Sequence, residues 1–381
     1  MYDFTRVNQY LDHVHTDLGA PCCDAQVCYH GEPVYRYITG VADKQNGIAA
    51  SDKTLYFLYS CTKPVTAAAA LQLVEQGRIG LDDELSRYLP EFKDAFTLVD
   101  GKPQRVSRPI TIRHLLTMSS GYNYALDSEP IRAAREQFGP QATTRQMISA
   151  YAEMPLLFEP GTRWEYGVSL DIMATVIEEV SQMRYGEYLR KNIFDVLGMD
   201  ADIGFDLTEE QLTRVADQYR IVDSGPLRDE PKSIGAFRLS PRFESGGAGL
   251  FASLNNYGKF AAAMSCGGAL PGAGRILKPE TVRLMGTEQL SGHLSNPTFD
   301  FGEWHVGYGY GLGVRTLVDR SAGQRSALGE MGWDGAASAY ILMDAAQEVS
   351  IVYAQHTLNW PARFANVHTP LRDLVYDCLG L

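Results

Sequence analysis

Segments that favour β-strands lie at both ends of this chain, and segments that favour helices fill its middle. Near the start, residues 23–30 and 34–41 are short β-prone runs separated by residues 30–33, His-Gly-Glu-Pro, a pattern typical of a hairpin. From about residue 306, alternating Gly and Tyr and then the runs 337–343 and 348–354 indicate further strands. We therefore predict one sheet built from both chain ends, with a mostly helical part inserted between them.

The segment 61–76 carries the clearest helical pattern, because its Ala-rich run ends at Gly77 and Pro64 falls in the first turn, where proline is tolerated. Similar patterns predict helices over 111–118, 169–182, 255–265 and 370–379. The predicted fold class is α/β, of the α+β kind. We predict a sheet domain from residues 1–60 and 240–381, a mostly helical domain from 61–239, and an active site at their interface.

Charge and composition exclude several partners. The chain has 381 residues and a formal net charge of -12, with Lys and Arg scattered along it, so neither nucleic acid nor a membrane surface is a predicted partner. No basic start followed by an apolar run is visible, and the six cysteines are thinly spread. We therefore expect reduced thiols and a cytoplasmic location. No sequence pattern indicates an oligomeric state.

Several catalytic and cofactor motifs are absent from the sequence. It contains no G-x-S-x-G, no H-E-x-x-H and no G-x-G-x-x-G, and neither Gly-Lys pair is followed by Ser or Thr. No pair of cysteines has the spacing of a zinc knuckle. The sequence therefore predicts no metal and no cofactor, and it argues against an α/β-hydrolase nucleophile elbow.

Ser60 is the only serine with a lysine three positions later, Lys63. The pair follows the β-prone run 55–59 and opens the helix predicted over 61–76, so both side chains share one helical face, with Cβ atoms roughly 5–6 Å apart. A lysine that is neutral through burial can take the proton of a serine hydroxyl, and a nearby tyrosine can share that proton. The segment 60–63, Ser-Cys-Thr-Lys, is by itself equally compatible with Ser60 as a helix cap and Lys63 as a solvated side chain.

Five segments in order resemble the serine β-lactamase and penicillin-binding-protein superfamily, and most closely its class C β-lactamases and the related family VIII carboxylesterases. They are FLYSCTKPVTAAAALQLVEQGRIGLDDELSRYLPEF (57–92), ITIRHLLTMSSGY (110–122), EPGTRWEYGVSLDIMATVIEEVS (159–181), ESGGAGLFASLNNYGKFAAAM (244–264) and GEMGWDGAASAYILMD (329–344). The resemblance spans roughly residues 20 to 360. It implies a β-lactamase/transpeptidase-like fold, in which helices flank an antiparallel sheet.

The resemblance also implies roles for individual residues. Ser60 matches the acylated nucleophile and Lys63 its proton partner. Tyr166 matches the tyrosine of the Tyr-x-Asn motif, which acts as general base and then as acid to the leaving group. The amide of Ala336, next to the family's Lys-Thr-Gly strand motif, would join the amide of Ser60 in an oxyanion hole. A tyrosine at such a position can equally be a packing aromatic.

Two positions depart from the β-lactamase pattern. The asparagine of Tyr-x-Asn is replaced by Val168, and Lys-Thr-Gly is replaced by Trp333, Asp334 and Gly335. Trp333 would offer an aromatic wall to substrate, and Asp334 would repel the carboxylate that a β-lactam or a cell-wall peptide presents there. Both changes favour a neutral, partly apolar acyl ester. The approach to the site is predicted to be lined by aromatic and imidazole side chains, namely Tyr122, Tyr124, Trp304 and His305.

The leading interpretation is a serine carboxylesterase that cleaves small or medium acyl esters through an acyl-enzyme on Ser60. Its partner is a small-molecule ester or a β-lactam-like substrate. Activity as a β-lactamase or a D,D-peptidase, or as an acyltransferase on the same scaffold, stays open. A catalytically inactive binding module is the alternative outside the enzyme class.

Overall fold

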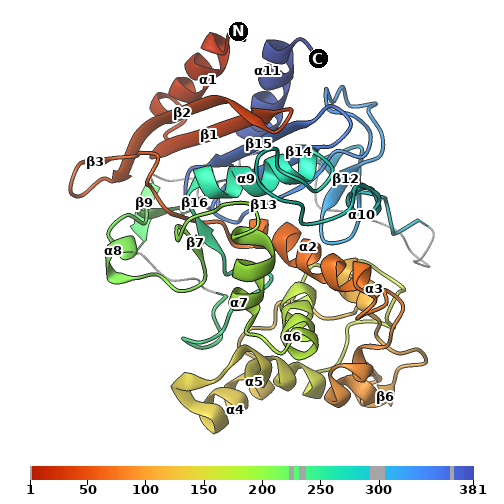
Figure 1. The fold of residues 1–381 in the computed structure, drawn as a ribbon. Coiled ribbons are helices and arrows are strands. Elements are labelled where there is room, and N and C mark those ends of the chain that lie inside the picture. The colour runs from red at the N-terminus through yellow and green to blue at the C-terminus, as the bar shows by residue number, and fades with distance from the viewer. Residues whose placement is uncertain (1, 223–226, 231–236, 292–304, 361–363) are drawn as a thin grey trace.

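One antiparallel sheet, built from both ends of the chain, organises the structure (Figure 1), a computed structural model that describes residues 2–222, 227–230, 237–291, 305–360 and 364–381. Strands β1 and β15 pair across the two ends, from Asp24 opposite Ala354 to Tyr29 opposite Val349. The strand order among the described residues is β11 (Tyr308–Tyr310), β12 (Arg315–Leu317), β13 (Met331–Asp334), β14 (Tyr340–Asp344), β15 (Val349–Ala354), β1 (Cys22–Tyr29), β2 (Glu32–Asp43) and β3 (Ile48–Ala49). The predicted fold class is confirmed.

Helices cover both faces of this sheet. Helices α1 (Thr5–Thr16) and α11 (Thr369–Leu379) lie side by side on one face, and α9 (Leu254–Ser265) packs on the other, against β1, β14 and β15. Alternation along β14 explains how one strand serves two cores: Leu342 packs with α1 and α11, whereas Ile341 and Met343 belong to the core on the α9 side. All three side chains are fully buried.

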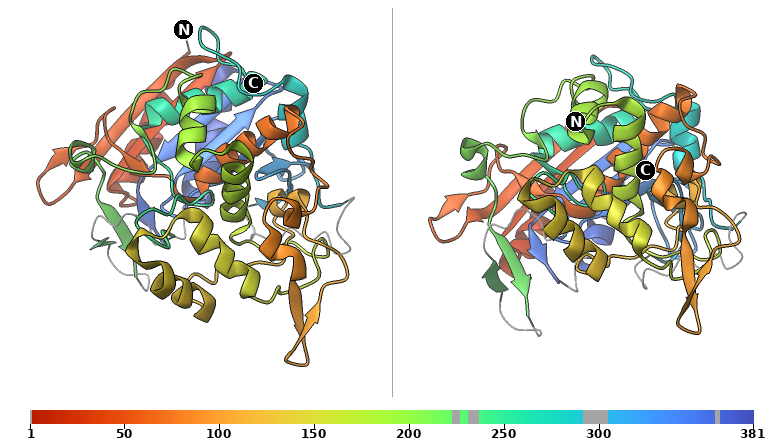
Figure 2. Two further views of the ribbon diagram at one scale, coloured as in Figure 1. Left: turned by 60° about the horizontal axis from the view of Figure 1, so that its bottom comes forward. Right: turned by 90° about the horizontal axis from the view of Figure 1, so that it is seen from below.

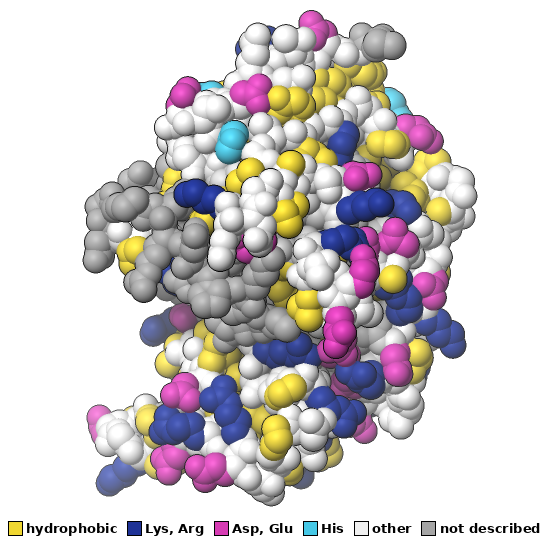
Figure 3. Space-filling view, turned by 90° about the vertical axis from the view of Figure 1, so that its left-hand side faces the viewer, with side chains coloured by type: hydrophobic (Ala, Val, Ile, Leu, Met, Phe, Trp, Pro, Cys, Tyr) yellow, Lys and Arg dark blue, Asp and Glu magenta, His cyan; other side chains and the backbone are white. Residues whose placement is uncertain are grey.

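The middle of the chain folds beyond the α9 side of the sheet (Figures 1 and 2). Its helices are α2 (Thr62–Glu75), α3 (Ile112–Leu116), α4 (Glu129–Phe138), α5 (Thr144–Ser149), α6 (Ser169–Ser181), α7 (Tyr185–Leu189) and α8 (Glu209–Leu212). The hairpin β5–β6 (Phe96–Val99 and Lys102–Arg105) projects from it (Figure 2, orange). On the face shown in Figure 3, acidic and basic side chains are interspersed over this part.

Short strands connect the two parts. Strands β4 (Tyr56–Phe57), β10 (Phe251–Ala252) and β7 (Ile203–Gly204) form one small sheet, and β16 (Thr357–Leu358), β8 (Gln218–Ile221) and β9 (Leu227–Glu230) form another. Helix α10 (Pro279–Met285) packs on α2. Strands β5 to β9 fall between residues 61 and 239, so this segment is not purely helical. The domain boundaries at residues 60 and 240 stay a prediction.

Helix α2 is buried on all sides, and its small side chains explain why. Residues Ala67 to Ala70 are fully buried, and they let α6, α10 and β13 approach the helix axis closely. Gly313 lies so close to this helix that a Cβ atom on it would stand 2.6 Å from the Ala67 Cβ. Helix α2 therefore holds its N-terminal residues rigidly between the sheet and the helical part.

The predicted helices all occur, each within two residues of its expected ends; α3 is shorter than 111–118 at both ends. One strand prediction needs correction. The run 337–343 becomes a strand only from Tyr340, because the chain from Gly335 to Ser338 forms a tight turn in which the Ser338 amide donates to the Gly335 carbonyl. Within the described ranges, no helix combines the length and apolar character needed to cross a bilayer.

The core between the sheet, α1 and α11 gives a test of this packing. Replacing the fully buried Leu342 with Ala should lower the free energy of unfolding by about 3 kcal/mol, because it leaves a cavity between two layers. Leu328, with 59% of its surface exposed, is the matched control, and Leu328→Ala should change stability by less than about 0.5 kcal/mol. Urea unfolding measures both, and equal losses would contradict the assigned layers.

Candidate active site

Ser60 lies in a short 3₁₀ turn, Tyr59–Cys61, between strand β4 and helix α2. Tyr59 has a φ of 47°, a left-handed conformation that is rare for a residue with a side chain. Two contacts stabilise it: the Thr62 hydroxyl donates to the Tyr59 carbonyl at 2.6 Å, and the Tyr59 hydroxyl donates to Gln218. This sharp bend presents the Ser60 side chain, which is 7% exposed, at the beginning of α2.

Lys63 is completely buried and its amine reaches three oxygen atoms. The Nζ atom lies 3.0 Å from the Ser60 hydroxyl, 2.9 Å from the Tyr124 hydroxyl and 2.7 Å from the Gly247 carbonyl. The alternative of a solvated Lys63 is therefore wrong. Ser60 is also not the helix cap, because Cys61 precedes the first residue of α2.

Burial lowers the pKa of Lys63 to about 7, against weaker opposing effects of Asp171 and Cys61. A neutral amine has two N–H donors and one lone pair. The Gly247 carbonyl can only accept a hydrogen bond, so it takes one donor. When Lys63 is neutral, its lone pair can therefore accept a proton from a hydroxyl, and the Ser60 and Tyr124 hydroxyls are both within reach.

Tyr166 completes the group around the Ser60 hydroxyl. Its hydroxyl is hydrogen-bonded to the Ser60 side chain and accepts a hydrogen bond from the Trp333 indole N–H at 3.0 Å. Its ring stacks on Trp333 with centroids 5.5 Å apart, and the Lys63 amine lies 4.5 Å from the centre of the ring. Burial raises the pKa of Tyr166, so its phenol is neutral near pH 7. The three residues predicted to be catalytic thus lie in contact.

The end of strand β13 lies against the turn that carries Ser60. The Cys61 thiol is 3.7 Å from the Trp333 carbonyl. A Cβ atom on Gly335 would stand 2.4 Å from the Leu58 carbonyl, so only glycine fits this crossing. Ala336, the predicted second oxyanion donor, follows directly. The structure therefore brings residues 333–336 beside Ser60, as the sequence predicts.

The prediction for Asp334 needs correction. Its carboxylate is 8% exposed and lies in a buried cluster, 3.3 Å from the Arg315 guanidinium, 3.2 Å from His305 and 3.0 Å from His368. Arg315 and both imidazoles hold its pKa well below the usual range, against the opposing effect of burial. Because neighbouring groups compensate this charge inside the protein, Asp334 does not present a free anion that would repel a substrate carboxylate.

Three further residues predicted to contact substrate are packing residues. Tyr122 is 2% exposed and its ring meets Phe92 and Tyr151 edge to face. Val168 is 1% exposed, at the start of α6, in the core of the helical part. His305 is buried, stacks on Trp333 and contacts the Asp334 carboxylate. Trp304, predicted at the approach, lies outside the described residues.

Trp333 itself has a different role from the one predicted. Only 1% of it is exposed, and its ring lies in a row of aromatic side chains between Tyr166 and Tyr310. Its indole N–H donates a hydrogen bond to the Tyr166 hydroxyl. Trp333 therefore supports Tyr166, the tyrosine predicted to be catalytic, and offers little surface to a substrate.

Sequence reasoning underestimated Tyr124 and missed Gly247 and Asp171. The sequence places Tyr124 only at the approach to the site, but its hydroxyl contacts Lys63. The glycine-rich run 246–249 reads as a tight loop, yet no pattern indicates that the Gly247 carbonyl binds Lys63. Asp171 looks like an ordinary first-turn helix residue, although it is 3% exposed and faces this loop. Spacing in the sequence cannot reveal such contacts between distant segments.

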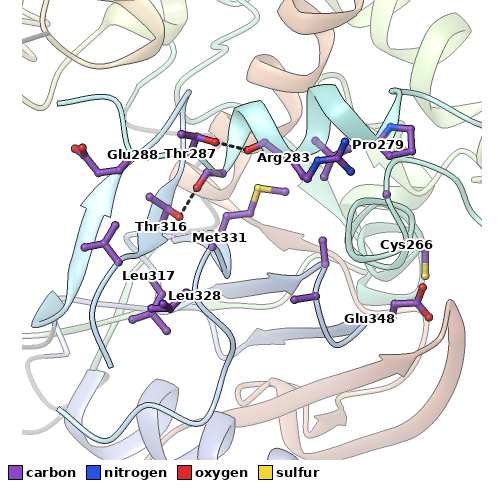
Figure 4. Close-up of a pocket in the computed structure, with 17 residues that line it drawn as sticks. Cys266, Pro279, Arg283, Thr287, Glu288, Thr316, Leu317, Leu328, Met331 and Glu348 are labelled. Atoms are coloured by element: carbon purple, nitrogen blue, oxygen red, sulfur yellow. Dashed lines mark hydrogen bonds between the residues drawn. The ribbon is translucent and has the colours of Figure 1, made fainter. Parts of the chain in front are cut away.

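A groove of about 760 Å³ lies elsewhere, between α10, strands β12 and β13 and the turn after β14 (Figure 4). The hydroxyls of Thr287 and Thr316 in its wall already donate to the carbonyls of Arg283 and Gly286. Its lining residues include no serine or lysine. The groove thus lacks the nucleophile and base found around Ser60, which remains the candidate active site.

Comparison with known proteins identifies the family. The family model described as Beta-lactamase matches residues 7–375, nearly the whole chain. The chain belongs to the beta-lactamase family. The resemblance seen in the ordered sequence segments is therefore confirmed.

Relatives in this family include enzymes that act on esters. Lovastatin esterase of Penicillium rubens is 33% identical over 79% of this chain and 79% of its own length. Esterase EstB of Burkholderia gladioli is 29% identical over 92% of this chain and 90% of its own length. The solved structure of EstCE1, described as a hydrolase with promiscuous acyltransferase activity, superposes with a TM-score of 0.78 at 26% identity and covers 97% of both chains.

The buried cluster of Asp334, Arg315, His305 and His368 predicts an effect on the free energy of unfolding. Replacing Asp334 with Ala should lower the free energy of unfolding by about 3 kcal/mol, because it leaves the 3% exposed Arg315 without its nearest carboxylate. Asp127→Ala is the matched control, since that carboxylate is 74% exposed and pairs with Arg135 at the surface. The control should lose much less in urea unfolding. Equal losses in the two variants would contradict the cluster.

Proposed function

We propose that this protein is a serine hydrolase that cleaves carboxylic esters through an acyl-enzyme on Ser60. The observation that carries the proposal is the fully buried Lys63 amine, 3.0 Å from the Ser60 hydroxyl. Burial lowers the pKa of this amine to about 7. A lysine that is substantially neutral near pH 7 can act as a base, whereas an ordinary lysine cannot.

In the acylation step, the Ser60 oxygen attacks the ester carbonyl carbon as its proton moves to Lys63, directly or through Tyr166. The amides of Ser60 and Ala336 donate to the oxyanion of the tetrahedral intermediate. The bond from the carbonyl carbon to the alcohol oxygen then breaks. Tyr166 returns the proton to the departing alcohol and regains one from Lys63, which leaves an acyl group on Ser60.

Deacylation repeats these roles with water. Tyr166 and Lys63 together accept a proton from the water that attacks the acyl carbon, and Ser60 leaves as the hydroxyl. Trp333 matters in both half-reactions, because its indole N–H stabilises the Tyr166 oxygen whenever that oxygen carries negative charge. An alcohol in place of water would give acyl transfer, and the ester test below uses water as the only acceptor.

A neutral acyl ester of small or medium size is the substrate class that we propose. The strand position where related enzymes carry Lys-Thr-Gly holds Trp333, so this position supplies no cation for a substrate carboxylate. The Asn of Tyr-x-Asn is replaced by Val168, which is buried and cannot bind an amide. The names of the related lovastatin esterase and Esterase EstB agree with ester substrates.

Substrate preference is tested with a chromogenic short-chain ester and a chromogenic cephalosporin. The wild-type protein should turn over the ester and hydrolyse the cephalosporin far more slowly, and Ser60→Ala should reduce ester turnover by roughly a thousandfold. Ser321→Ala, which removes an exposed serine hydroxyl, is the matched control and should keep wild-type activity. Faster cephalosporin than ester turnover would overturn the esterase assignment.

The pH dependence of acylation follows from Lys63. Because only the neutral amine accepts the Ser60 proton, kcat/KM for the ester should rise with pH and reach half of its plateau near the Lys63 pKa of about 7. Lys63→Met should abolish this activity while the protein stays folded, because methionine fills the same volume without a buried amine. A profile that keeps rising up to about pH 10 would show that Lys63 keeps the pKa of a solvated lysine.

A further inference from the structure

Asp171 is a buried carboxylate to which the catalytic scheme above gives no role. It lies in the first turn of α6, five residues after Tyr166, and is 3% exposed. Its Oδ1 atom accepts hydrogen bonds from the Ser245 hydroxyl at 2.5 Å and from the Gly247 amide at 3.1 Å. A charged group this deeply buried requires compensation, and these two neutral donors provide only part of it.

The loop held by Asp171 is the loop that contacts Lys63. The Gly247 amide points to Asp171, and the carbonyl of the same residue accepts a hydrogen bond from the Lys63 amine at 2.7 Å. There is no room for a side chain at Gly247, since a Cβ atom there would stand 2.5 Å from the Asp171 Oδ2 and 3.2 Å from the Tyr124 hydroxyl. The carboxylate, the loop and the amine thus form one packed unit.

The catalytic scheme creates a charge at this place. When Lys63 takes the Ser60 proton, a cation forms on a side chain that is fully buried. Water cannot solvate this cation, so its free energy depends on fixed dipoles and charges nearby. The Gly247 carbonyl supplies one dipole. A full negative charge at Asp171 would supply the larger part of the compensation.

We propose that Asp171 is a positioning residue that acts through Lys63: it holds the Gly247 carbonyl against the amine and provides the counter-charge for the lysine cation formed during acylation. This proposal rests on the ester-hydrolase function proposed above. It assigns a role in the reaction to a residue that touches neither the substrate nor the Ser60 hydroxyl.

The other titratable groups around Lys63 are neutral near pH 7. Cys61, on its own turn, has a thiol pKa that burial raises. Tyr124 and Tyr166, from the two loops that cover the amine, have phenol pKa values that burial raises as well. Among the described residues that act on the pKa of Lys63, Asp171 is therefore the one that can carry a negative charge at that pH.

Asp171 is itself subject to two opposing effects. Burial raises the pKa of its carboxyl above the usual value, and the hydrogen bond from Ser245, the charge on Lys63 and the hydrogen bond from Gly247 offset only part of this rise. The Ser245 hydroxyl and the Gly247 amide both donate to one oxygen, Oδ1, and a cation on Lys63 favours the ionised form of the carboxyl. Asp334, another buried carboxylate, is compensated by Arg315 and is not among the groups that shift the pKa of Lys63.

The direction of the effect can be derived from this charge. A nearby anion favours the charged form of a lysine, so Asp171 raises the pKa of Lys63 against the larger lowering by burial. Removing the charge with Asp171→Asn should therefore lower the Lys63 pKa by about one unit or more. The acidic limb of the kcat/KM profile should move to lower pH by the same amount, and the plateau should fall about tenfold because a less basic amine accepts the proton less readily.

The experiment compares wild type, Asp171→Asn and two further variants over the full pH range with a chromogenic ester. Glu178→Gln is the matched control, because it makes the same chemical change on the same helix, and its limb should stay at the wild-type pH. Ser245→Ala removes one hydrogen bond to Asp171 but keeps the charge, so its limb should also stay. Circular dichroism and thermal unfolding establish that each variant is folded.

The proposal would be overturned if the acidic limb of the kcat/KM profile of Asp171→Asn stayed at the wild-type pH, and also if it shifted to higher pH. If Asp171→Asn does not fold, Asp171→Ser, which is also neutral and leaves room for water, is measured against the same criterion. Labelling of wild type with a fluorophosphonate separates the two proposals. Failure to label Ser60 refutes the hydrolase function, whereas normal labelling with an unmoved Asp171→Asn limb refutes only the role of Asp171.

Discussion

The burial of one amine, that of Lys63, is the constraint on which the rest of the site depends. An isolated ammonium with no exposed surface is costly, so the protein must either neutralise it or surround it with acceptors. The structure does both: the pKa falls to about 7, and the amine has three oxygen partners. The Ala-rich α2 makes this burial possible, because small side chains allow α6, α10 and β13 to close around the helix.

Strand β13 of the large sheet supports the residues around Lys63 from the side opposite the helical part. Strand β13 ends against the Ser60 turn, where Gly335 crosses the Leu58 carbonyl, and its Trp333 holds the Tyr166 hydroxyl. Behind Trp333, the buried ion cluster around Asp334 secures the end of the strand. Trp333, which resembles a specificity determinant in the sequence, thus supports Tyr166, the proposed general base. In the proposed function, the preference for neutral esters rests on the absence of a lysine at this strand position and not on the charge of Asp334.

The sequence allowed the fold and the grouping of Ser60, Lys63 and Tyr166 to be predicted because both rest on local or ordered patterns. The sequence directly shows the helix periodicity, the strand-rich ends and the three-residue spacing of Ser60 and Lys63. The directions of the Asp334 and Tyr122 side chains could not be predicted in this way, since each depends on which distant residue packs against it. The contact of the Gly247 carbonyl with Lys63 was invisible for the same reason, because a backbone group has no residue-type signal.

The most direct test of the account is the pKa of the Lys63 amine itself. It can be measured by NMR on protein labelled with ¹³C at the lysine ε carbon, titrated with pH, with the Lys63 resonance assigned by its loss in Lys63→Met. We expect a midpoint near pH 7 for Lys63, because burial lowers its pKa to about 7. A midpoint near the ordinary lysine value of about 10.4 would contradict it, because Ser60 would then face a permanent cation and have no base.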